Sequence, residues 1–177
     1  GLSDSARDKA TKARRSAADA SEMIRNVLQI DQMESGSLQL DCRKFTLAEA
    51  LEEAAHNLEP QFQFKEQDLK IKGSFTMQVV ADRDLLRRVV QNLLGNAAKF
   101  APKKSGIELE CSGSGAEFVI AVENPGAVIP REDLRRIFDK FSQVGERPQA
   151  ARQGCGLGLA FCRLAAEAHS GRIEAIS

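Results

Sequence analysis

The sequence contains no tryptophan and no tyrosine, so its nine phenylalanines are its only aromatic residues. Histidine and cysteine are also scarce, with two and four copies in 177 residues. No two cysteines form a Cys-x-x-Cys pair and the histidines lie far apart, so we expect no zinc site. The cysteines are interpreted as reduced thiols that are buried or incidental. They are Cys42, Cys111, Cys155 and Cys162.

An excess of charge of one sign is also absent, because lysine plus arginine and aspartate plus glutamate each number 25. This balance removes the bulk electrostatic attraction to nucleic acid or anionic membranes, and no nucleic-acid partner is expected. The sequence has no apolar run long enough to span a bilayer and does not open on a signal peptide. We therefore expect a cytoplasmic fragment, whose parent protein could still carry a membrane anchor elsewhere.

Residues 4–33 lack glycine and proline and are rich in helix-forming residues, which predicts one helix roughly 45 Å long. Small and apolar side chains recur along one face of it at steps of three and four. Such a stripe predicts a bundle or a coiled-coil-like dimer, and the alternative is packing on the chain's own domain. The stripe consists of Ala6, Ala10, Ala13, Ala17, Ala20, Ile24, Val27 and Met33.

The rest of the chain alternates short apolar strands with helices. Thr46 and Glu49 have capping-box spacing, and Pro60 is expected to end the helix that they begin. Asp82 is expected to cap the following helix. We predict an α+β fold, a two-layer sandwich in which helices cover a mixed sheet, with the long helix at its N-terminus. Strands are predicted at 38–41, 69–72, 77–80, 107–111, 117–122 and 172–176, and helices at 46–58, 82–100, 131–137 and 156–168.

Two polar patterns carry candidate chemistry. Asn92, Asn96 and Lys99 share one face of the helix predicted at 82–100. Amide oxygens suit Mg²⁺ and an ammonium suits a phosphate, although two solvated asparagines would give the same pattern. Residues 154–159, Gly-Cys-Gly-Leu-Gly-Leu, open the last helix. Alternate glycines and a helix N-terminus favour an anionic ligand, and the alternative is a glycine-rich turn.

In this order, the two patterns resemble the histidine kinase branch of the Bergerat-fold ATPases. Residues 92–100 resemble its N box, 137–143 its phenylalanine box and 154–159 its second glycine box. Residues 34–38 resemble the junction between a dimerisation helix and the catalytic domain, and Asp82 matches the aspartate that opens the N-box helix. The implied domains are 1–36, a partial dimerisation helix, and 37–177, an ATP-binding catalytic domain cut off in its last strand.

The resemblance implies ATP and Mg²⁺ as cofactors. Asn96 would bind the metal, Asn92 would help to arrange it, and Lys99 would contact the phosphates. Residues 145–153 would form a lid over the nucleotide, with Phe138 and Phe141 at its base, and either Arg147 or Arg152 would reach the phosphates. The implied nucleotide-binding set is Asn96, Lys99, Phe100, Asn124, Gly126, Val128, Gly154, Gly156, Leu157 and Gly158.

The chain departs from the family at the first glycine box, where Asp-x-Gly-x-Gly is expected. Asn124 replaces the aspartate whose carboxylate accepts the adenine amino group in the family. Its carbonyl oxygen still accepts a hydrogen bond but lacks the charge, at a cost of roughly 1 kcal/mol. Val128 replaces a glycine and puts a β-branched side chain beside the base. These changes predict weak or altered nucleotide binding, and the alternative is neutral drift in a working kinase.

The family's phosphoacceptor histidine lies on a helix that this chain lacks. His56 and His169 match no acceptor position. The resemblance implies a protein-histidine kinase domain that phosphorylates a histidine on a dimerisation domain, for relay to a response regulator. The expected assembly is a homodimer through the N-terminal helix. A degenerate pseudokinase that signals by conformation or docking is the main alternative, and a Bergerat-fold protein-serine kinase is a third.

Overall fold

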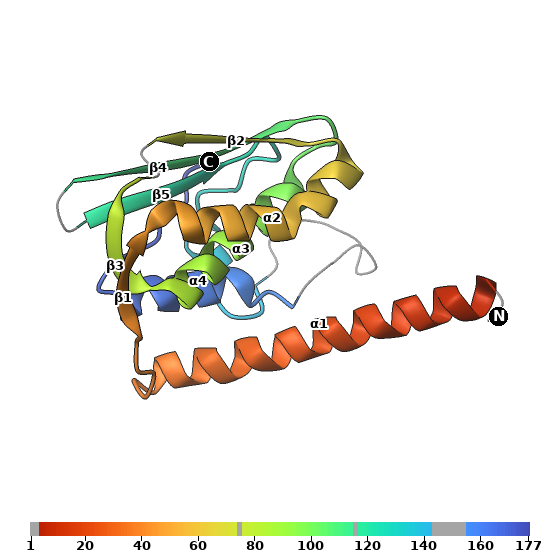
Figure 1. Ribbon diagram of the computed structural model, residues 1–177, viewed down its shortest axis with the longest axis horizontal. Helices are drawn as coiled ribbons and strands as arrows, with labels where there is room; N and C mark the ends of the chain where they lie inside the picture. Colours follow the sequence, from red (N-terminus) through yellow and green to blue (C-terminus); the bar gives the residue numbers. More distant parts are fainter. Residues whose placement is uncertain (1–3, 74–75, 115–116, 143–154) are drawn as a thin grey trace.

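The computed structural model describes residues 4–73, 76–114, 117–142 and 155–177. From α1 to α4, helices and strands follow one another in the order that the sequence predicts, with a 3₁₀ helix near 131–137 in place of an α-helix (Figure 1). The elements are α1 (Asp4–Glu34), β1 (Cys42–Thr46), α2 (Leu47–Lys65), β2 (Asp68–Gly73), β3 (Gln78–Asp82), α3 (Arg83–Phe100), β4 (Gly106–Ser114), β5 (Glu117–Glu123), the 3₁₀ helix η1 (Arg136–Phe138) and α4 (Gly158–Ala168).

The main sheet has the order β2-β4-β5, with β2 parallel and β5 antiparallel to the central β4. A second, two-stranded sheet pairs β1 with β3. Helices α2, α3 and α4 lie on one side of the main sheet (Figure 1). Side chains from α2, α3 and β4 fill the space between them, and Leu51, Leu94 and Leu109 are at most 1% exposed. The predicted α+β sandwich with a mixed sheet is confirmed.

Helix α1 packs against the rest of the molecule near its C-terminal end, and its N-terminal part projects away from the other described elements (Figure 1). Ile30 is buried in a second apolar cluster with Phe161 of α4. Asn26 is also buried, and its Oδ1 accepts a hydrogen bond from Arg88 Nη2. The Arg88 guanidinium lies 4.3 Å from the centre of the Phe161 ring, a cation–π contact between α3 and α4. The docking of α1 therefore combines apolar burial with one buried polar contact.

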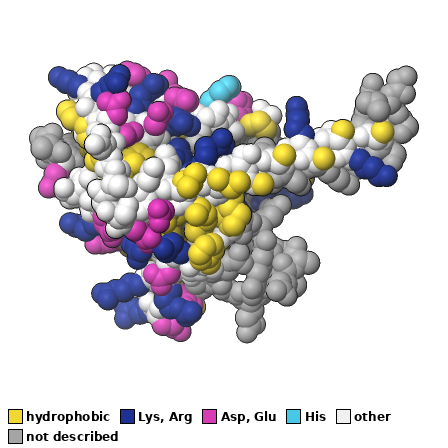
Figure 2. Space-filling view, turned by 90° about the horizontal axis from the view of Figure 1, so that it is seen from below, with side chains coloured by type: hydrophobic (Ala, Val, Ile, Leu, Met, Phe, Trp, Pro, Cys, Tyr) yellow, Lys and Arg dark blue, Asp and Glu magenta, His cyan; other side chains and the backbone are white. Residues whose placement is uncertain are grey.

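The projecting part of α1 keeps its small and apolar stripe exposed (Figure 2). Met23, Ile24, Val27 and Leu28 are between 41% and 61% exposed. The residues of the predicted stripe from Ala10 to Val27 are therefore exposed, whereas Met33 packs against the second apolar cluster. No helix in the described ranges combines the length and the apolar composition needed to cross a membrane.

Several predicted boundaries are wrong. Pro60 does not end a helix, because α2 continues through it to Lys65. The proline is exposed, and Phe62 beyond it is buried in the core. Residues 38–41 form no strand, and β1 begins at Cys42 instead.

Two further elements near the C-terminus also differ from the prediction. Residues 131–137 form turns and the start of η1, and residues 172–176 lie in no strand.

Candidate functional site

Helix α3 carries the predicted polar face, and its first turn is held by side chains. Asp82 Oδ1 accepts the backbone N–H of Leu85 at 3.0 Å, which is the N-cap predicted from the sequence. The backbone N–H of Asp82 donates to His169 Nε2 at 3.0 Å. His169 Nδ1 lies 2.8 Å from the Ala165 carbonyl oxygen, which makes it the donor there. His169 thus joins the end of α4 to the start of α3.

The last turn of α3 is held by two side chains from the C-terminal end of α2 and the turn that follows it. Lys65 Nζ donates to the carbonyl oxygens of Ala98, Lys99 and Ala101 at 2.7, 2.8 and 3.1 Å. Gln67 Nε2 donates to those of Ala98 and Ala101 at 3.2 and 3.1 Å. The terminal carbonyls of a helix lack partners within it, and a cation there also complements the helix dipole. Nothing in the local pattern of the sequence predicts this contact.

The start of α4 meets the side chain of Asn92 on α3. A Cβ atom added to Gly158 would lie 2.8 Å from Asn92 Oδ1, closer than real Cβ contacts allow. The two predicted patterns therefore come together in space, and the absence of a side chain at Gly158 permits it. Asn92 and Asn96 are both partly buried. Leu157 is 1% exposed and packs in the cluster with Phe161, so its side chain faces the core.

Residues 141 and 142 of the phenylalanine box pack against the turn at Gly156. Gly156 has φ +70°, and a Cβ there would lie 2.8 Å from the Ser142 carbonyl oxygen. The backbone N–H of Phe141 donates to the Gly156 carbonyl at 3.0 Å. Phe138 is buried, whereas Phe141 is 62% exposed. Gly154 and residues 145–153, with Arg147 and Arg152, lie outside the described residues.

The altered glycine box lies at the C-terminal end of α3. A Cβ on Gly126 would lie 3.4 Å from the Phe100 carbonyl oxygen and 3.3 Å from Asn124 Nδ2. Asn124 Nδ2 donates to the Pro125 carbonyl at 3.0 Å. Val128 is 76% and Phe100 is 44% exposed. The structure thus brings this box and the end of α3 together. The apolar side chains of Phe100 and Val128 are exposed to solvent beside them.

Lys99 lies at the same end of α3. Its Nζ is 4.9 Å from the centre of the Phe100 ring, so its charge faces this aromatic side chain.

The thiols of Cys111 and Cys162 are buried and unreactive. Burial raises the pKa of the Cys162 thiol and raises that of Cys111 to about 11, so both stay neutral near pH 7.

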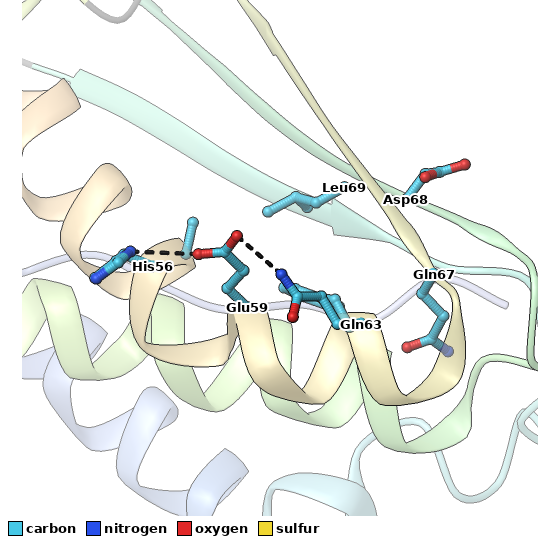
Figure 3. A pocket seen from close by; sticks show the side chains of 8 residues that line it. His56, Glu59, Gln63, Gln67, Asp68 and Leu69 are labelled. Carbon is cyan, nitrogen blue, oxygen red and sulfur yellow. Dashed lines mark hydrogen bonds and ion pairs between the residues drawn. The ribbon is translucent and has the colours of Figure 1, made fainter.

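A groove of about 370 Å³ lies away from these residues, between α2 and β2 (Figure 3). Its lining includes His56, Glu59, Gln67, Asp68 and Leu69. It contains none of the predicted site residues, so the pocket and the polar face of α3 are separate features.

A family model described as histidine kinase-, DNA gyrase B- and HSP90-like ATPase matches residues 81–177. The chain therefore belongs to this ATPase family, and the resemblance to its histidine kinase branch is confirmed. The match contains α3, the altered glycine box and the start of α4.

Among the relatives, the sensor protein KdpD of Clostridium acetobutylicum is 33% identical over 158 residues. The aligned part covers 88% of this chain and 17% of KdpD, so the chain spans less than a fifth of that relative's length. Full-length ShkA in complex with AMPPNP has a TM-score of 0.77 at 24% identity, over 96% of this chain and 35% of ShkA. A nucleotide-free catalytic domain of histidine kinase ThkA has a TM-score of 0.64 at 26% identity, over 72% of this chain and 80% of ThkA.

We expect Lys65→Met to lower the free energy of unfolding by about 2 kcal/mol, because it leaves helix-end carbonyls without their charged donor. Urea denaturation followed by circular dichroism measures this change. Lys104→Met is the matched control, since the Lys104 side chain is 73% exposed and its ion pair with Glu66 spans 3.6 Å. Equal stabilities for the two variants would contradict the role assigned to Lys65.

Proposed function

We propose that residues 37–177 bind Mg²⁺·ATP as the catalytic domain of a protein-histidine kinase. The transferred phosphoryl group would go to a histidine on a dimerisation domain, and from there to a response regulator. The observation that supports this best is the approach of Gly158 to Asn92, which sets a glycine-flanked helix start against a side-chain amide. Free N–H groups at a helix start favour phosphate, and amide oxygens favour Mg²⁺.

The residues present fit a Mg²⁺-bound nucleotide. Asn96 stands one turn after Asn92 on the same helix face and would bind the metal, with Asn92 arranging it. Lys99, one turn further, would contact the phosphates. The backbone at Gly156 and Gly158 would contact the phosphates. The space that their side chains would take is filled by the backbone of residues 141 and 142 and by the Asn92 side chain. A bound metal would neutralise phosphate charge, and the chain's own residues would orient the nucleotide.

The adenine base would lie by Asn124, Gly126 and Val128. The partly exposed side chain of Phe100 is next to this position. Asn124 would accept the adenine amino group through Oδ1, because its Nδ2 already donates to the Pro125 carbonyl. Val128, exposed at this edge, would narrow the space for the base. This arrangement favours weaker binding than a carboxylate and a glycine would give.

Residues 1–36 would act as one helix of a dimerisation domain. The exposed apolar stripe of α1 supports a homodimer, because an unpaired stripe of this kind is costly in water. The phosphoacceptor would come from outside the chain. His56 is a surface residue 3.5 Å from Glu59, and His169 is engaged between α3 and α4.

We expect the chain to bind ADP and a non-hydrolysable ATP analogue with micromolar affinity that depends on Mg²⁺. Asn96→Ala should abolish the Mg²⁺ dependence because it removes the proposed metal ligand. Calorimetric titration with and without Mg²⁺ measures both effects. If a folded sample does not bind nucleotide at millimolar concentration, the kinase proposal is wrong and the pseudokinase alternative is favoured.

Asn124→Asp should tighten ADP binding about tenfold, because the carboxylate restores a charge-assisted hydrogen bond to the base. The same titration gives the dissociation constants. Asn57→Asp, the same exchange on the exposed surface of α2, is the control and should leave the affinity unchanged. An unchanged affinity for Asn124→Asp would mean that the base does not lie at this residue.

Gly158→Ala should weaken Mg²⁺·ADP binding by at least about tenfold, because the added Cβ displaces the Asn92 amide. Gly106→Ala is the matched control, since a Cβ there meets no atom within 4 Å. Thermal unfolding checks that both variants remain folded. Equal affinities for the two variants would refute the proposed place of Asn92 in the site.

A further inference from the structure

The altered glycine box presents a side-chain amide at the proposed position of the base. Asn124 is partly buried, and its Nδ2 donates to the Pro125 carbonyl at 3.0 Å. A Cβ added to Gly126 would lie 3.3 Å from this nitrogen, so the amide packs closely against the turn that follows it. The amide is therefore held by the loop that carries it.

An amide and a carboxylate offer different hydrogen bonds to a base. An ionised carboxylate accepts hydrogen bonds and donates none, whereas a carboxamide has two N–H donors and one acceptor oxygen. The Pro125 carbonyl takes one Nδ2 hydrogen of Asn124, and the amide has a second hydrogen and Oδ1 besides. Asn124 therefore combines a donor with an acceptor, which a carboxylate at this position would not do.

Two classes of purine match this pair of groups. Adenine has an amino group at C6, which donates to Oδ1 of Asn124. Guanine and hypoxanthine are 6-oxopurines, with an acceptor oxygen at C6 and an N–H donor at N1. For these bases Oδ1 accepts the N1 hydrogen and the second Nδ2 hydrogen donates to the C6 oxygen, while the bond to Pro125 is kept. A carboxylate would instead face the lone pairs of that oxygen.

The other residues beside the base do not distinguish purines by shape. Val128 is 76% and Phe100 is 44% exposed, so these two side chains leave the position open on its apolar side. Contact with an apolar or aromatic side chain is available to every purine, because each has an aromatic face. An open position also lets the base shift within its plane between the two hydrogen-bond patterns. Discrimination between purines therefore depends on Asn124.

We propose that Asn124 is a specificity-determining residue that admits 6-oxopurine nucleotides, such as GDP and IDP, in addition to adenine nucleotides. This inference rests on the proposed function, because it takes the base to lie at Asn124 and the phosphates at the start of α4. The site then binds Mg²⁺ complexes of guanosine and inosine nucleotides in the place of those of adenosine.

Calorimetric titration of the full chain with ADP, GDP and IDP, each with Mg²⁺, tests the proposal. We expect the dissociation constants of GDP and IDP to lie within about tenfold of that of ADP, and ADP to displace both. If GDP and IDP bind more weakly than this, or do not bind, the inference is wrong and the proposed function stands. If a folded sample binds none of the three, both are wrong.

Asn124→Asp separates recognition by the amide from a general affinity for purines. It should weaken IDP binding by about tenfold, because the carboxylate faces the C6 oxygen, whereas ADP binding tightens. IDP is the probe because its base lacks the 2-amino group of guanine, which is a further donor to a carboxylate. Asn57→Asp, on the exposed surface of α2, should change neither affinity. An IDP affinity that Asn124→Asp leaves unchanged would overturn the role assigned to Asn124.

Discussion

The position of helix α3 depends on a positive charge placed among its terminal carbonyls. Lys65 Nζ donates to three backbone carbonyls at the end of this helix, and the two hydrogens of Gln67 Nε2 are shared among three. Each such bond from a charged donor is worth more than a neutral one, and the carbonyls would be costly to leave unpaired. Because Lys65 is the last residue of α2 and Gln67 follows it by two residues, the packing of α2 on the sheet also fixes where α3 ends. The altered glycine box rests against that end.

The contact between α3 and the start of α4 depends on the absence of a side chain at Gly158. Helix α4 begins at Gly158, in contact with Asn92, and any larger residue there would displace the Asn92 side chain. His169 at the far end of α4 binds the first turn of α3, so the two helices are joined at both ends. Phe161 and Cys162, both fully buried, pack between these two contacts. The separation of the polar side chains on α3 from the start of α4 is therefore set by packing, before any ligand binds.

Much of this arrangement follows from the sequence, because it rests on local rules. The cap at Asp82, the bounds of α3 and the β4–β5 hairpin were all predictable from spacing. Pro60 was misjudged because burial of Phe62 extends α2 beyond a residue that local rules treat as a stop. Leu38 and Leu40 alternate like a strand, yet they pack against the cluster around Phe161.

The contacts of Lys65 with the end of α3 and of Gly158 with Asn92 could not be predicted, for a different reason. Both depend on contacts between residues far apart in the chain, and no periodicity encodes such contacts. The sequence therefore indicates which residues carry the chemistry, whereas tertiary packing decides which of them meet.

The junction with α1 shows which contacts control its docking. The Lys140–Glu34 ion pair is partly exposed at 2.8 Å, and such pairs contribute at most about 1 kcal/mol. Ile30 is 3% exposed, and burial of a side chain of this size contributes about 1.5–3 kcal/mol. Release of α1 would also break the hydrogen bond from Arg88 Nη2 to Asn26 Oδ1. The burial of Ile30 and the hydrogen bond of Asn26 therefore hold α1 against α3 and α4. The Lys140–Glu34 ion pair contributes less to the stability of this contact. Lys140 directly precedes Phe141, whose backbone N–H donates to the Gly156 carbonyl, so one short segment contacts both the end of α1 and the glycine turn.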